Sequence, residues 1–76
     1  MSDQTLSISE RFVAAAEKAL TDNRVSLNTP RGQQEKTRLI QIFERALFSE
    51  VRLGNQPDVV ADAIIKINLR HYGWTK

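Results

Sequence analysis

The segment from Thr29 to Leu53 is predicted to form one long helix, and the rest of the chain is expected to be organised around it. Thr29 is predicted to be the N-cap residue of this helix, and Pro30 its first helical residue. A proline at that position costs no hydrogen bond, because the N–H that it lacks would have no partner within the helix. From Leu39 onward the apolar residues follow the helical period, and Gly54 supplies a C-cap. The opening turns of this helix are wholly polar, so we expect them to project beyond the core or to fray.

Two shorter helices are predicted on either side of this segment. Ser7 and Glu10 have the spacing of a capping box, which begins a helix over residues 8–22. The run Leu53-Gly54-Asn55-Gln56-Pro57-Asp58 ends the long helix and begins another. The sequence therefore predicts a single all-α domain over residues 1–76, a small three-helix bundle with a flexible arm at 1–6 and helices at about 8–22, 30–53 and 57–72.

The C-terminal helix is expected to be the central one, and the bundle is expected to pair with a second copy. Its polar residues form one stripe with i,i+4 spacing, which favours an Asp62–Lys66 ion pair. Its remaining surface is so apolar that one neighbouring helix cannot cover it. A chain of 76 residues has a marginal core, and without cysteine no disulfide can support it. We therefore expect a homodimer.

Composition favours a small globular protein without a membrane segment. Hydrophobic residues make up 41% of the chain and charged residues 26%. The first ten residues have neither the basic nor the apolar region of a signal peptide, and no stretch approaches the roughly 18 apolar residues of a membrane span. We expect a cytoplasmic protein that does not bind a membrane.

Four arginines recur at steps of seven along the long helix: Arg31, Arg38, Arg45 and Arg52. A step of seven drifts by only about 20° around a helix, so the side chains form one stripe with a spacing of about 10 Å. Phe48 lies between the last two arginines, and aromatic residues and arginine are enriched at protein interfaces. Arg31 has Glu35 to pair with and is set aside. The predicted partner-binding residues are Arg38, Gln41, Arg45, Phe48 and Arg52.

Three other interpretations of this stripe remain open at the level of sequence. A charged stripe is usually a solvated helix face. The arginines also suit nucleic-acid phosphates, with Phe48 stacking on a base. Phe48 is alternatively covered by the N-terminal arm or by Trp74. A helix-turn-helix is disfavoured because the helix that would read DNA begins with acidic and apolar residues at 57–62.

Glu50 is the one carboxylate that falls within the apolar arc of the long helix. An unpaired buried carboxylate is costly, so we expect a partner at the end of the third helix, such as His71, Tyr72 or the indole N–H of Trp74. Glu50, His71 and Trp74 are thus candidates for an interface or a pH-sensitive latch. The alternative places Glu50 at the rim of the core near the helix end.

The sequence contains none of the common catalytic or cofactor motifs. One histidine and no cysteine leave no Ser-His-Asp or Cys-His arrangement and no zinc site within one chain. The three glycines are isolated, so there is no phosphate-binding loop. We expect a non-enzymatic regulatory or interaction protein without cofactor or metal, which binds a protein partner. The alternative function is that of a nucleic-acid-binding accessory protein or transcriptional regulator.

Overall fold

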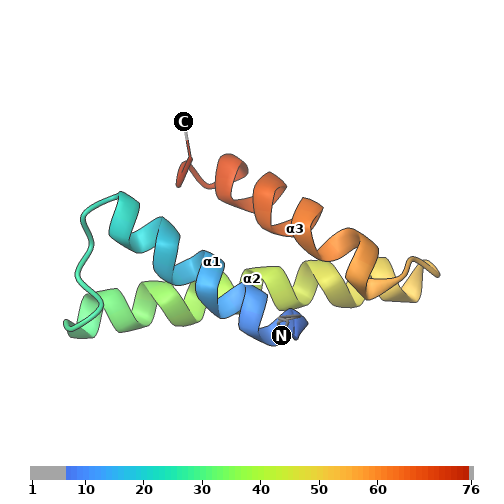
Figure 1. The fold of residues 1–76 in the computed structure, drawn as a ribbon, viewed down its shortest axis with the longest axis horizontal. Coiled ribbons are helices and arrows are strands. Elements are labelled where there is room, and N and C mark those ends of the chain that lie inside the picture. The colour runs from blue at the N-terminus through green and yellow to red at the C-terminus, as the bar shows by residue number, and fades with distance from the viewer. Residues whose placement is uncertain (1–6, 76) are drawn as a thin grey trace, which may run out of the picture.

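The computed structural model describes residues 7–75, which fold into three α-helices (Figure 1). These are α1 (Ile8–Asp22), α2 (Pro30–Arg52) and α3 (Pro57–His71). The described residues contain no strand, so the predicted all-α three-helix bundle is confirmed. Leu53 and Tyr72, which were expected to end the second and third helices, are instead their C-cap residues. The predicted arm at residues 1–6 lies outside the described residues.

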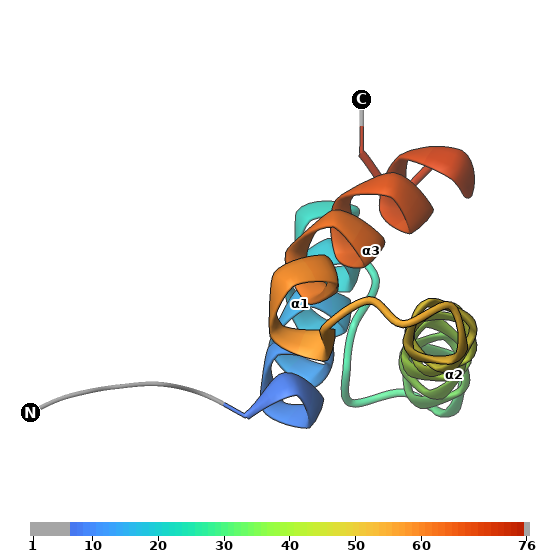
Figure 2. The same cartoon turned by 90° about the vertical axis from the view of Figure 1, so that its right-hand side faces the viewer.

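The bundle is arranged around α2. Figure 1 shows that α1 and α3 run in the same direction and both cross α2, which runs the opposite way. Viewed along α2, the other two helices lie together on one side of it (Figure 2). α3 contacts both other helices, but α2 makes a more extensive contact with each neighbour than those two make with each other, so the expectation that the C-terminal helix is the central one is wrong.

All three helices contribute to the core. Its fully buried large side chains are Phe12 and Leu20 from α1 and Leu39 and Phe43 from α2. The Phe12 and Phe43 rings lie 5.4 Å apart, centroid to centroid, in a tilted arrangement. From α3 come the buried side chains of Ala61, Ile64 and Leu69. The core is therefore built where all three helices meet, and the C-terminal Trp74 packs against it half-buried.

The start of α2 is held in place by the loop before it, so it is not frayed, although most of its residues are exposed and the core begins only at Leu39. The Thr29 hydroxyl accepts a hydrogen bond from the Gly32 N–H at 3.0 Å and donates one to the Ser26 carbonyl, also at 3.0 Å. Gly32 is buried beneath this loop. Gln33 adds a hydrogen bond from its side chain to the Leu27 carbonyl. Thr29 and Gln33 thus fix the loop to the first turn of α2.

Arg11 joins α1 to α3. Its guanidinium lies 3.0 Å from an Asp58 carboxylate oxygen and 3.4 Å from one of Asp62. Among the ion pairs of the described residues Asp62 pairs with Arg11, so the expected pair with Lys66 is wrong. The carboxylates of α3 serve a contact between helices, which spacing along one helix does not reveal. No helix within residues 7–75 is long and apolar enough to cross a membrane.

Candidate functional site

The arginine stripe lies on the outer surface of α2. Arg31, Arg38, Arg45 and Arg52 are all exposed. Within residues 7–75 the ion pairs involve Arg11, Lys18 and Lys36, and none involves an arginine of the stripe. The Arg31–Glu35 pair expected from the sequence is therefore absent from this part of the chain. We call Arg38, Gln41, Arg45, Phe48 and Arg52 the arginine face.

Phe48 is the aromatic centre of the arginine face. Its side chain is five residues after the buried Phe43, so it is turned about 140° away from the core, and it is 66% exposed. The guanidinium carbon of Arg52 lies 5.9 Å from the ring centroid, which is a cation–π contact. Trp74 does not cover Phe48, because it packs on the α3 side near Leu39 and Ile42. The interpretation of Phe48 as a residue covered by Trp74 is wrong.

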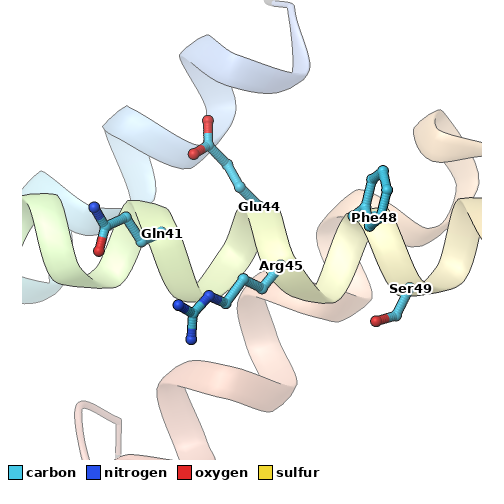
Figure 3. A pocket seen from close by; sticks show the side chains of 5 residues that line it. All are labelled: Gln41, Glu44, Arg45, Phe48 and Ser49. Atoms are coloured by element: carbon cyan, nitrogen blue, oxygen red, sulfur yellow. The ribbon is translucent and has the colours of Figure 1, made fainter.

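An open depression surrounds Phe48. It has a volume of about 620 Å³ and is lined by Gln41, Glu44, Arg45, Phe48 and Ser49. Figure 3 shows that Arg45 and Ser49 extend from α2 toward the side of α3, whereas Glu44 extends toward the side of α1. The cationic part of this surface thus borders α3. A partner that contacts both Phe48 and Arg45 approaches from the α3 side of the helix.

Glu50, His71 and Trp74 do not come together, so the latch expected from the sequence is wrong. Glu50 is half-buried at the rim of the core and accepts a hydrogen bond from the Asn55 side chain at 2.8 Å. α3 begins beside this end of α2 and leads diagonally away from it in the opposite direction (Figure 1), and Tyr72 and Trp74 beyond its end line a hollow with Leu39 and Ile42 of α2. Of the two interpretations of Glu50, the structure matches the one that places it at the rim.

The residues at the end of α3 have structural partners of their own. The His71 and Tyr72 rings meet edge to face with their centroids 4.9 Å apart. The Trp74 carbonyl accepts a hydrogen bond from the Asn23 side chain at 2.9 Å, which attaches the C-terminal segment to the end of α1. Asn23 has no sequence signal for this role beyond its position after α1. These contacts attach the aromatic C-terminus to the rest of the bundle.

A groove between α2 and α3 was not predicted from the sequence. It has a volume of about 390 Å³, and its apolar lining comes from both helices. Ser49 lines both this groove and the depression around Phe48. The one available signal was the surplus of apolar residues on α3, of which Ile67 lines the groove and is 65% exposed.

The described residues hold no arrangement of three or more His, Cys, Asp or Glu side chains that suits a metal ion. No protein-family model, no curated protein and no solved structure matches this chain. Its function must therefore be inferred from the surface of α2 and the groove beside it.

Proposed function

We propose that this is a non-enzymatic regulatory or interaction protein that binds a protein partner through the arginine face of α2. The observation that carries the proposal is an exposed Phe48 between Arg45 and Arg52, with the Arg52 guanidinium against its ring. Aromatic residues and arginine are the side chains most enriched among the residues that dominate binding energy at protein interfaces.

The chemistry of this face specifies its partner in outline. Arg38, Arg45 and Arg52 have no carboxylate partner within residues 7–75, so their hydrogen-bond donors are free to pair with carboxylates of another protein. Phe48 offers an apolar body that gains free energy when it is removed from water. The proposed partner thus presents carboxylates on either side of an apolar pocket.

The test is capture of partners from the native cell by the wild-type chain and by the Phe48→Ala/Arg45→Glu variant. We expect the variant to lose the partner while its helical circular dichroism is unchanged, because both side chains are exposed. The matched control is Val51→Ala/Arg31→Glu, which makes the same change in charge with two exposed residues that lie outside the arginine face. Retention of the partner by the first variant, or equal loss from the control, would contradict the proposal.

The alternative function is nucleic-acid binding by the same face, in an accessory protein or transcriptional regulator. The observation in its favour is the row of exposed arginines without carboxylate partners in the described residues. The Glu44 carboxylate at the Phe48 depression repels phosphates and the carboxylates of a protein partner alike, so it does not separate the two functions. Binding to duplex DNA that weakens steeply with salt would support this alternative. The leading proposal expects no binding to duplex DNA even at low salt.

We also propose that two copies associate around the turn between α2 and α3. Leu53 and Val59 lie on either side of this turn and are 76% and 74% exposed. Covering them would add apolar contact to a core that is small for a free-standing domain. Sedimentation equilibrium should show a dimer that Val59→Asp dissociates, and a strictly monomeric wild-type chain at high concentration would contradict this proposal.

A further inference from the structure

A long groove follows the open side of the contact between α2 and α3. The wider part is the 390 Å³ hollow described above, and a second hollow of about 220 Å³ is lined in part by Ile42 and Tyr72. Ile42 lies four residues before Ala46 on α2, and Tyr72 lies four residues after Asn68 on α3. Ala46 and Asn68 line the wider part, and residues four apart share one side of a helix. The two hollows therefore follow one another along the same side of the contact between α2 and α3, and we treat them together as one groove.

The size and lining of this groove match an α-helix. From Arg38 to Ser49 the α2 wall is about 16 Å long, which corresponds to about three turns of a docked helix. The lining is predominantly apolar, as in grooves that accept the apolar stripe of an amphipathic helix. The apolar residues of the wider part are Ala46, Val60, Ala63, Ile64 and Ile67.

Both rims of the groove are cationic. On α2, Arg38 lines the narrower hollow, and Arg45 extends to the same side of the helix as Ser49 (Figure 3). On α3, Lys66 and Arg70 are exposed, and each lies three residues after a groove-lining residue, Ala63 or Ile67. Positions three apart are neighbours on a helix surface. These four cations have no carboxylate partner within residues 7–75.

The carboxylates near the groove lie toward its ends. Glu35 lines the narrower hollow. Glu50 lines the wider one and is hydrogen-bonded to Asn55. Between them the floor is apolar and the flanking charges are positive, so the electrostatic potential favours an anionic occupant.

We infer that this groove binds an amphipathic helix of the partner protein, with an apolar stripe on the floor and carboxylates along both flanks. The inference rests on the proposed function, since it identifies the partner segment that engages the α3 side of the arginine face. Ser49 makes the groove continuous with the depression around Phe48. One docked helix thus contacts the groove floor and Arg45, and its neighbouring residues reach Phe48.

The test uses a synthetic tryptophan-free peptide of about 18 residues, long enough to form a helix, with a leucine stripe flanked by glutamates. Trp74 is the single tryptophan of the chain and lines the narrower hollow, so its fluorescence reports binding. Two peptides serve as controls. One has lysine in place of every glutamate, and the other has the same composition in scrambled order. We expect only the ordered acidic peptide to bind and to change the emission of Trp74.

Two single substitutions locate the binding site. Ile67→Asp places a carboxylate in the groove at an exposed position, so the fold is retained, and we expect at least a tenfold loss of affinity (about 1.4 kcal/mol). Ala14→Asp is the matched control, because it places the same carboxylate at an exposed apolar position of α1, away from both the groove and the turn between α2 and α3. It should bind the peptide as the wild type does.

The inference is overturned if the acidic peptide does not bind, if the scrambled peptide binds equally well, or if Ile67→Asp leaves its affinity unchanged. It is also overturned if Ile67→Asp, rather than Val59→Asp, dissociates a dimer, because the groove then holds a second copy. Capture of the native partner separates the two proposals. If Phe48→Ala/Arg45→Glu loses the partner while Ile67→Asp retains it, partner binding by the arginine face is supported and helix binding in the groove is contradicted.

Discussion

The Arg52 guanidinium lies 5.9 Å from the centroid of the Phe48 ring, on a side of α2 where both residues are exposed. A cation–π contact at an exposed site is worth about 0.5–1 kcal/mol, so it favours this arrangement of the two side chains. Side chains that are ordered before binding lose less conformational entropy when a partner covers them. In the proposed function this contact would lower the entropic cost of association at the arginine face; it is not part of the core.

Substitution of the two phenylalanines of α2 should separate the contact surface from the core. Phe43→Ala removes a side chain with no exposed surface, and we expect it to cost about 3–5 kcal/mol of unfolding free energy. Phe48→Ala should change that free energy by less than about 0.5 kcal/mol, as is usual for surface substitutions. Urea unfolding followed by circular dichroism measures both. A Phe48→Ala variant as unstable as Phe43→Ala would show that Phe48 is covered in solution.

The Arg11 bridge between α1 and α3 should contribute little to stability. The Asp58 and Asp62 side chains are 83% and 80% exposed, so water screens their attraction to the guanidinium. The Nε atom of Arg11 is buried and has no hydrogen-bond partner among the described residues. Arg11→Met keeps the packing of the stem and removes this atom, so its unfolding free energy should stay within about 1 kcal/mol of the wild type.

Removal of the two carboxylates instead should lower the unfolding free energy more than Arg11→Met does. In Asp58→Asn/Asp62→Asn the guanidinium of Arg11, whose side chain is only 24% exposed, loses both ionic partners. Urea midpoints at low and high salt provide the measurement. The difference in midpoint between the wild type and the double variant should be smaller at high salt, because salt screens the ion pairs. A double variant at least as stable as Arg11→Met would contradict this prediction.

The helix ends could be predicted from the sequence because their signals are local. Ser7 and Glu10 form both reciprocal hydrogen bonds of the capping box, and the Thr29 side chain caps the turn that begins at Pro30. Gly54 has a φ of 93°, the left-handed conformation that glycine adopts readily after a helix. Each of these features depends on residues within four positions of one another.

The contacts between distant segments could not be predicted in the same way. A helical wheel shows that Glu50 points toward the core side of α2, but it does not show which end of α3 lies there. Arg11 pairs with Asp62 from 51 positions away. Of the candidate site, the arginine face follows from its repeat of seven residues. The groove depends on how α2 and α3 cross, and no local pattern determines that angle.

Gly32 should not tolerate alanine, although alanine favours helices by about 1 kcal/mol over glycine. A Cβ atom at this position would lie 1.8 Å from the Ser26 carbonyl oxygen, which is main chain and cannot rotate away. The loop would have to move, so we expect Gly32→Ala to lose about 1–3 kcal/mol. Gln34→Ala, two residues later and exposed, is the control and should be neutral or stabilising. Thermal unfolding compares the two variants. If Gly32→Ala had the same unfolding midpoint as the wild type, this loop would be loosely held.

The capping box of α1 should make stability depend on pH in the acidic range. The Ser7 N–H donates to a Glu10 carboxylate oxygen at 3.0 Å. This backbone hydrogen bond, and secondarily one from the Ser7 side chain, lowers the pKa of Glu10 from its ordinary value of 4.5. The folded state therefore keeps the carboxylate ionised where the unfolded chain is already protonated. The stabilisation is fully present above pH 4.5 and is lost as the pH falls through the lowered pKa.

Glu10→Gln isolates this contribution, because glutamine keeps a side-chain acceptor for the Ser7 N–H but carries no charge. We expect the wild type to be more stable than Glu10→Gln at neutral pH, with a difference that shrinks steadily below pH 4.5. Ser7→Ala retains the backbone donor, which is the larger cause of the lowered pKa. It should therefore keep most of the pH dependence while it loses the acceptor for the Glu10 N–H. Urea midpoints across the acidic range measure all three chains. If the difference in urea midpoint between the wild type and Glu10→Gln were the same at every pH, the charge of Glu10 would not stabilise α1.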